Sequence, residues 1–130
     1  MILLDSHVII WLALKPDRIS RAATAAIRRA DEAGELSATS AVCLFEIANA
    51  IRRGRVQIVI PADAFLGRIK SRFKIVPVSD EIAIHAGLLG DPFHGDPIDR
   101  LIAATAILEN CTLTTSDRKL LASGVCETLW

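Results

Sequence analysis

The sequence carries no net charge. Lys and Arg together number 15, and so do Asp and Glu, so no overall electrostatic field draws the chain to nucleic acid or to a membrane surface. Aromatic residues make up only 5%, which leaves few side chains that could stack on bases. Any polyanionic partner must therefore be bound by local patches.

Cysteines and long apolar runs are also scarce. The three cysteines, Cys43, Cys111 and Cys126, cannot all pair within one chain, which favours a reducing compartment. The apolar run from Val8 to Leu14 is too short to span a bilayer. We therefore expect a soluble cytoplasmic protein with no membrane partner.

The composition is otherwise that of an ordinary globular protein. Hydrophobic residues make up 52% and charged residues 23% of the chain, which excludes intrinsic disorder. A length of 130 residues suits a single domain over residues 1–130. A chain of this size buries about two-thirds of its unfolded surface, enough for a core without structural metals or disulfides.

Short apolar or β-rich segments alternate with helical ones along the chain. Strands are predicted at 1–4, 35–39, 74–78, 111–115 and 125–129. Helices are predicted at 6–14, 20–33, 40–53, 61–73, 79–90 and 96–110, with a short one after Ser116 and a loop at 90–95. This alternation predicts an α/β layered fold with a mostly parallel central sheet.

Four acidic residues stand out by their positions. Asp5 directly follows the first predicted strand, and Asp117 comes just after the strand at 111–115. Both therefore fall at strand carboxyl ends, where open α/β sheets bind ligands. Glu46 is the only charged residue in the range 40–51, and Asp99 begins an apolar run.

Three of these acids have an equally simple structural explanation. Asp5 and Asp117 could each cap the helix that follows, and Asp99 could stabilise the dipole of a helix capped by Asp96. Glu46 differs, because it lies in the middle of its predicted helix with no cationic residue one turn away. An unpaired carboxylate on such a face is costly to desolvate, so Glu46 favours a site that supplies positive charge.

A divalent cation would supply that charge if the acids converge. Two carboxylates about 5 Å apart repel each other by roughly 3 kcal/mol at an effective dielectric of about 20. Oxygen ligands without a cluster of histidines or cysteines suit Mg²⁺ or Mn²⁺. Such an ion serves phosphodiester hydrolysis, because it activates a water and stabilises the departing oxygen.

Four stretches of the chain match a known family in order and spacing. They are 1–12 with Asp5-Ser6-His7, 44–48 with Glu46, 94–106 with His-Gly-Asp-Pro-Ile-Asp-Arg, and 113–117 with Thr-Thr-Ser-Asp. With these stretches the chain resembles a PIN-domain ribonuclease, and more closely a VapC-type toxin of a type II toxin–antitoxin pair. The resemblance implies a three-layer α/β/α sandwich and an endoribonuclease that depends on Mg²⁺ or Mn²⁺.

The resemblance also implies roles for the acids and for partners. Asp5 and Asp99 would be the principal metal ligands. Glu46 and Asp117 would complete the catalytic cluster, directly or through water. The implied partners are an RNA substrate, a cognate antitoxin, and a second copy of the chain in a homodimer or in a toxin–antitoxin hetero-oligomer.

Further residues near the acids are expected to support the site. The hydroxyls of Ser6 and Thr115 would support the pocket, and Asp96 is expected to be a helix cap rather than a ligand. Arg100 and Arg118 each stand beside one of the acids and are candidates for contacting substrate phosphates.

Two departures from the family pattern leave every carboxylate in place. Ser6 stands where threonine is commoner, and Phe45 stands where tryptophan is often found. Two other functions remain open at this stage. One is a magnesium-dependent phosphatase, disfavoured because no second carboxylate follows Asp5 and no glycine-rich phosphate loop is present. The other is a non-catalytic module that binds a cation and a partner.

Overall fold

The structure, a computed structural model, describes residues 1–90 and 96–130. Residues 91–95, which include most of the expected loop and His94, lie outside the described residues.

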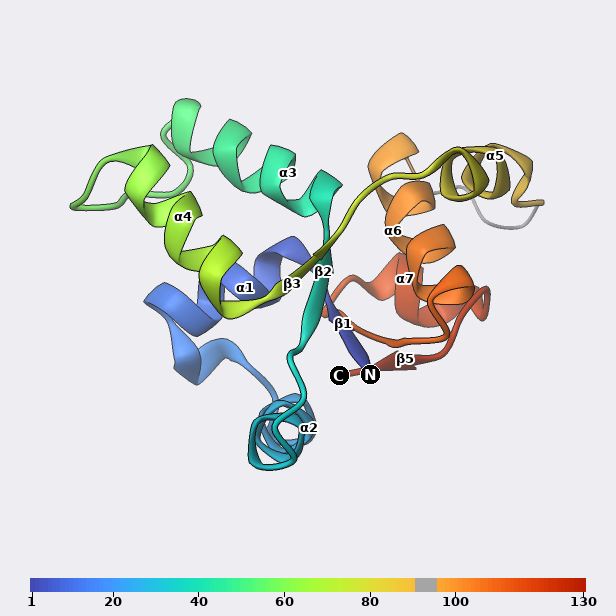
Figure 1. Cartoon of the computed structure of the whole chain (residues 1–130), viewed down its shortest axis with the longest axis horizontal. Coiled ribbons are helices and arrows are strands. Elements are labelled where there is room, and N and C mark those ends of the chain that lie inside the picture. The colour runs from blue at the N-terminus through green and yellow to red at the C-terminus, as the bar shows by residue number, and fades with distance from the viewer. Residues whose placement is uncertain (91–95) are drawn as a thin grey trace.

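A parallel sheet of five short strands forms the centre of the molecule (Figure 1). The strands lie in the order β3-β2-β1-β4-β5, and all four strand pairings are parallel, which confirms the predicted sheet. Their bounds are β1 (Ile2–Leu4), β2 (Ala38–Ser40), β3 (Lys74–Val76), β4 (Thr112–Thr114) and β5 (Thr128–Leu129).

Helices cover both faces of this sheet. In Figure 1, α1, α3 and α4 lie on one side of the strands, and α5, α6 and α7 lie on the other. The fold is therefore the three-layer α/β/α sandwich that the resemblance implied. The helices of the described residues are α1 (Ser6–Leu14), the 3₁₀ helix η1 (Pro16–Arg18), α2 (Arg21–Glu32), α3 (Ala41–Arg52), α4 (Ala62–Arg72), α5 (Asp80–Leu88), α6 (Pro97–Leu108) and α7 (Arg118–Ser123).

Alternation of side chains along β1 divides the core into two clusters. Leu3 packs with Ile102 of α6 and Leu120 of α7, whereas Leu4 packs with Val8 of α1 and Ile47 of α3. Successive residues of a strand point to opposite faces of the sheet, so both of these fully buried leucines anchor a helical layer. Both layers are thereby held against the strand that Asp5 follows.

Local signals in the sequence account for most helix ends. Ser20, Ser40 and Ser79 each accept a hydrogen bond from a backbone N–H in the first turn of α2, α3 and α5. Gly34 follows the C-cap of α2 with a φ of 72°, a left-handed conformation that favours glycine. Of these helices, α3 and α5 each follow a strand, so their capped starts lie at the carboxyl edge of the sheet.

Several boundaries differ from the sequence prediction; β3, α5 and α6, for example, each end two residues earlier than predicted. β2 begins at Ala38 rather than at residue 35, and β5 covers only Thr128–Leu129, because only those residues pair with the short neighbouring strands. The turn at 16–18, which we did not predict, is a 3₁₀ helix that begins with Pro16.

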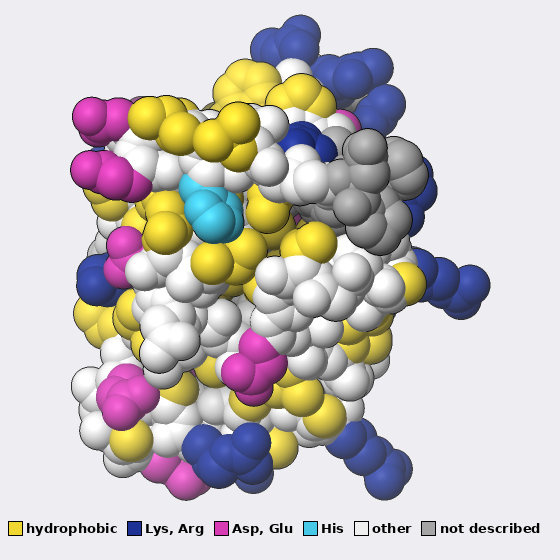
Figure 2. Space-filling view, turned by 90° about the vertical axis from the view of Figure 1, so that its right-hand side faces the viewer, with side chains coloured by type: hydrophobic (Ala, Val, Ile, Leu, Met, Phe, Trp, Pro, Cys, Tyr) yellow, Lys and Arg dark blue, Asp and Glu magenta, His cyan; other side chains and the backbone are white. Residues whose placement is uncertain are grey.

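The outer face of α5 and α6 exposes several large apolar side chains, namely Ile84, Leu88 and Leu108. Figure 2 shows hydrophobic side chains spread over this face of the molecule. Across the described ranges 1–90 and 96–130, no helix combines the length and hydropathy that a membrane crossing requires.

Candidate functional site

The candidate site lies where the direction of the chain across the sheet reverses. From β1 the chain proceeds through β2 to β3 on one side, and then returns to build β4 and β5 on the other side of β1. In an open α/β sheet this switch point leaves a crevice at the carboxyl ends of the two central strands. Asp5 follows β1 at this point, and its backbone N–H donates a hydrogen bond of 3.1 Å to the carbonyl of Thr114 in β4.

The carboxylate of Asp5 is buried and held at both oxygens. Its Oδ1 accepts a 2.7 Å hydrogen bond from the backbone N–H of Ser6, and so it caps α1. Its Oδ2 accepts a 2.7 Å hydrogen bond from the hydroxyl of Thr115. Only 5% of the residue is exposed. Asp5 is therefore both a helix cap and a fixed carboxylate in the crevice.

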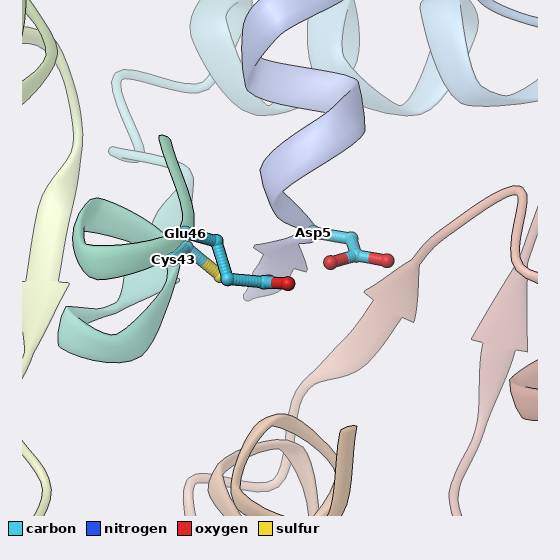
Figure 3. A group of neighbouring side chains, drawn as sticks. All are labelled: Asp5, Cys43 and Glu46. Atoms are coloured by element: carbon cyan, nitrogen blue, oxygen red, sulfur yellow. The ribbon is translucent and has the colours of Figure 1, made fainter. Parts of the chain in front are cut away.

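Glu46 reaches the same place from α3, as Figure 3 shows. The hydroxyl of Ser6 donates a 2.9 Å hydrogen bond to Glu46 Oε1. Ligand atoms of Asp5, Cys43 and Glu46 all lie within 4.8 Å of one another. Burial raises the pKa of Glu46, the charge of Asp5 raises it further, and the hydrogen bond from Ser6 opposes both effects.

Cys43 is the member of this group that the sequence did not point to as a site residue. Its thiol lies 3.9 Å from the carbonyl oxygen of Leu4, and burial raises its pKa to about 12. The thiol is therefore protonated at neutral pH, as expected of a small buried hydrophobe. The donors that remain are carboxylate oxygens, which suit a hard cation such as Mg²⁺ or Mn²⁺.

Asp99 lies in the first turn of α6 and is electrostatically coupled to the other acids. The Oδ1 of Asp96 accepts a 2.9 Å hydrogen bond from the backbone N–H of Asp99, so Asp96 is the N-cap of α6. Burial raises the pKa of Asp99 to about 7, and the charges of Asp96, Asp117, Asp5 and Glu46 raise it too. Negative charge is therefore concentrated around Asp99.

Asp117 is the N-cap of α7 and is linked to Asp5 through Thr115. Its Oδ1 accepts hydrogen bonds from the backbone N–H groups of Lys119 and Leu120, at 2.8 and 3.1 Å. Its own backbone N–H donates a 3.0 Å hydrogen bond to the hydroxyl of Thr115, the group that donates to Asp5. Asp117 therefore caps α7, and among the described residues neither it nor Asp99 belongs to the group of ligand atoms within 4.8 Å of one another that Asp5, Cys43 and Glu46 form.

The two candidate phosphate-binding arginines differ in their surroundings. The Nε of Arg100 donates a 2.9 Å hydrogen bond to the carbonyl of Ala86, and Nη2 donates to the carbonyls of Gly87 and Leu89. Arg100 thus ties α6 to the end of α5, a structural role that its position next to Asp99 in the sequence did not indicate. Arg118 is exposed at the start of α7.

None of the four acids belongs to an ion pair of the described residues. Within the described part of the chain, the one ion pair joins Arg72 to Asp31, at 3.3 Å, and includes none of the four acids. Asp5 and Glu46 lie close together and belong to no ion pair of the described residues, and burial raises the pKa of Glu46, which fits a site for a divalent cation.

Comparisons with known proteins agree with this architecture. The sequence matches the PIN domain family over residues 2–123. It is 40% identical, over 119 residues, to Ribonuclease VapC22 of Mycobacterium tuberculosis, a match that covers 92% of this chain and 88% of that protein.

Solved structures share the fold at lower sequence identity. One is a toxin–antitoxin complex from Klebsiella pneumoniae, with a TM-score of 0.72 and 23% identity over 100% of this chain and 97% of that one. Another is VapBC2 from Rickettsia felis bound to a DNA fragment from their promoter, with a TM-score of 0.70 and 19% identity over 99% of this chain and 98% of that one. The family match and the 40% identical relative together show that the chain belongs to the PIN-domain family.

Proposed function

We propose that the protein is a metal-dependent endoribonuclease and the toxin of a type II toxin–antitoxin pair. The observation that carries the proposal is the cluster of acids at the switch point of the sheet, in which Ser6 joins Glu46 to Asp5. Support also comes from the 40% identical relative, which is named as a ribonuclease.

Four acids would hold the ion in this proposal: Asp5, Glu46, Asp99 and Asp117. The ion would be Mg²⁺ or Mn²⁺, because the available donors are carboxylate oxygens. When bound, a divalent ion of this kind neutralises the acids, activates water for attack on a phosphodiester and stabilises the departing oxygen.

The protein's own groups orient the acids before any ligand arrives. Thr115 and the backbone of Ser6 fix the two oxygens of Asp5, and the Ser6 hydroxyl fixes one oxygen of Glu46. The raised pKa of Asp99 means that this carboxyl is partly protonated near neutral pH in the absence of a cation. A cation that binds must therefore displace that proton, which makes metal binding dependent on pH.

A cognate antitoxin is the proposed protein partner, and the cytoplasm is the proposed location. The structural neighbours named above include toxin–antitoxin complexes, which supports a cognate antitoxin as partner. A homodimer or a hetero-oligomer with that antitoxin is the proposed assembly, with residues 1–130 acting as one PIN domain. Free cysteines at 43, 111 and 126 fit action in the reducing cytoplasm, where RNA is available.

The test is cleavage of a mixed pool of structured and single-stranded RNA by the purified protein. We expect endonucleolytic products with 5′-phosphate ends in Mg²⁺ or Mn²⁺ and none in EDTA. Asp5→Asn should lower the rate by more than about 100-fold, because even an outer-shell partner of a metal ligand costs about 10–100-fold. Asparagine also caps helices, so this variant keeps the cap of α1.

The control is Asp63→Asn, an exposed acid in the first turn of α4. It should cleave at the wild-type rate. Metal binding without cleavage of any RNA would favour the non-catalytic binding module, and release of phosphate from small phosphomonoesters would favour the phosphatase.

A further inference from the structure

The group of donors at the carboxyl end of β1 contains a sulfur atom as well as carboxylate oxygens. Ligand atoms of Asp5, Cys43 and Glu46 all lie within 4.8 Å of one another. Figure 3 shows the Cys43 side chain beside that of Glu46; both come from α3, whereas Asp5 follows β1. The proposed function uses only the carboxylates, so it leaves the thiol without a role.

The spacing of the three donors suits one small divalent ion. Zn²⁺ in proteins lies about 2.3 Å from a thiolate sulfur and about 2.0–2.2 Å from a carboxylate oxygen. Two ligands of one tetrahedral Zn²⁺ are therefore about 3.4–3.6 Å apart. Donors already within 4.8 Å of one another reach this geometry by small movements of the side chains.

The thiol distinguishes this group from a site made only of carboxylates. Mg²⁺ and Mn²⁺ prefer oxygen ligands, so they leave a thiol protonated and uncoordinated. Zn²⁺ is a softer ion that binds thiolate, and its binding releases the thiol proton. The two kinds of ion would therefore share the carboxylates of Asp5 and Glu46, but only Zn²⁺ would also bind Cys43.

The surroundings of Cys43 allow a metal to replace its proton. Cys43 is the third residue of α3, and the backbone dipoles at the start of a helix stabilise a thiolate. Its Sγ lies 3.9 Å from the carbonyl oxygen of Leu4, which already accepts a 2.8 Å hydrogen bond from the hydroxyl of Thr39. The long contact with Leu4 is therefore weak, and little is lost when the proton leaves.

An ion can reach the three donors from the surface. Glu46 and Ser6 line a groove of about 800 Å³, whereas Asp5 and Cys43 are buried. The donors thus combine a buried side, which excludes competing water, with an open side, which provides the entry path that a metal site needs.

We propose that Asp5, Cys43 and Glu46 form a binding site for Zn²⁺, in which the Cys43 thiolate selects Zn²⁺ over Mg²⁺ and Mn²⁺. On binding, a Zn–S bond forms, the S–H bond breaks and the proton passes to water. Because the two carboxylates are shared, Zn²⁺ and Mg²⁺ compete for them. The inference rests on the metal site of the proposed function and adds to it an ion that would regulate its occupancy by Mg²⁺.

The test is titration of the full chain, in metal-free buffer, with Co²⁺ as a spectroscopic probe for Zn²⁺. A bond between Co²⁺ and thiolate gives a charge-transfer absorption band in the near ultraviolet, which carboxylate ligands do not give. We expect this band in the wild type and its loss in Cys43→Ala. The control Cys126→Ser, which removes a more exposed thiol, should keep the band. Added Zn²⁺ should abolish it by displacing Co²⁺.

Calorimetry measures the selectivity that the thiolate provides. Cys43→Ala should lower the ratio of Zn²⁺ affinity to Mg²⁺ affinity by about 100-fold or more, because even an outer-shell partner of a metal ligand is worth about 10–100-fold. Cys43→Ser keeps the size of the side chain and should lower the ratio too, because a serine hydroxyl stays protonated. Circular dichroism checks that both variants are folded. The ratio reports the ligand itself, since a general loosening of the site weakens both ions.

The Zn²⁺ site and the proposed activity can fail separately. A band that persists in Cys43→Ala, a band lost in Cys126→Ser, or an unchanged affinity ratio in both Cys43 variants overturns the Zn²⁺ site and leaves the ribonuclease standing. A band that depends on Cys43, in a protein that cleaves no RNA in Mg²⁺, supports the Zn²⁺ site while the ribonuclease fails.

Discussion

The hydroxyl of Ser6 donates a hydrogen bond of 2.9 Å to Glu46, which is 40 residues away in the sequence. The same hydroxyl lies 3.4 Å from Asp5 Oδ1, which accepts a hydrogen bond from the Ser6 backbone N–H. Ser6 thus forms hydrogen bonds with both acids. It sets how the two carboxylates face each other.

Removing this hydroxyl should weaken metal binding. In Ser6→Ala the hydrogen bond that lowers the pKa of Glu46 is lost, so its pKa should rise further. We expect Mg²⁺ affinity at pH 7, measured by isothermal titration calorimetry, to fall by about 10-fold or more. The decrease should be smaller at higher pH, where a larger fraction of Glu46 is ionised. Ser6→Thr keeps a hydroxyl and should retain wild-type affinity; an equal loss in both variants would show that the hydroxyl is not the cause.

Thr115 should matter for the site as well as for stability. Thr115→Val keeps the shape of the side chain but removes the donor to Asp5 and the acceptor for the Asp117 N–H. We expect the free energy of unfolding to fall by about 1–3 kcal/mol, measured by urea denaturation, and metal affinity to fall with it.

A matched control for this variant is Thr105→Val. Thr105 is equally buried, but its hydroxyl donates to the carbonyl of Leu101 within α6. Thr105→Val should lower the free energy of unfolding without lowering the affinity for Mg²⁺. If both variants bind Mg²⁺ as the wild type does, Thr115 has no part in orienting Asp5.

The raised pKa of Asp99 predicts how stability depends on pH without metal. The folded protein holds a proton on Asp99 up to about pH 7, whereas the unfolded chain releases it near the ordinary value of 3.8. Because the native state binds more protons over this range, the free energy of unfolding contributed by Asp99 falls as pH rises from about 4 to 7.

Asp99→Asn removes the loss of stability that ionisation of the Asp99 carboxyl causes in the folded protein. We expect the variant to be about 1 kcal/mol more stable than the wild type at pH 7.5 in EDTA, a reduced figure because solvent screens this half-buried side chain. At pH 3.5 the two proteins should be equally stable. Mg²⁺ should raise the melting temperature of the wild type more than that of the variant. A variant less stable at pH 7.5 in EDTA would contradict the account.

Arg100 should stabilise the C-terminal end of α5. Arg100→Lys loses the planar group that bonds the carbonyls of Ala86, Gly87 and Leu89. We expect a loss of about 2 kcal/mol in the free energy of unfolding and faster hydrogen exchange in α5, measured by mass spectrometry. Arg29→Lys, on α2, should change neither. Unchanged exchange in α5 would contradict this structural role.

Much of the fold follows from local features of the sequence. The apolar strand before Asp5 and the serine caps of α2, α3 and α5 are readable directly, and so is Gly34 after α2. The convergence of Asp5 with the strand at 112–114 follows from the rule that ligands bind at strand carboxyl ends. The short lengths of β2 and β5 do not, because they depend on which residues pair with neighbouring strands.

The site itself was only partly visible in the sequence. Glu46 could be singled out because its helix offers no cationic neighbour, but its contact with Ser6 depends on tertiary packing. Asp5 seemed to require a choice between capping and the site, and the structure shows that its carboxylate caps α1 and also lies close to Glu46. Asp117 caps α7, and its role as a metal ligand stays a prediction. The bonds of Arg100 to the carbonyls of Ala86 and Gly87 could not be predicted from its adjacency to Asp99, and its contact with a substrate phosphate stays a prediction.

The most direct test of the central claim is the rate of RNA cleavage by Glu46→Gln under single-turnover conditions. Glu81→Gln, an exposed glutamate in the first turn of α5, is the matched control. The account predicts that Glu81→Gln cleaves at the wild-type rate in saturating Mg²⁺, and that Glu46→Gln, although folded, is slower by about 100-fold or more. Cleavage by Glu46→Gln at the wild-type rate, or wild-type cleavage that persists in EDTA, would contradict it.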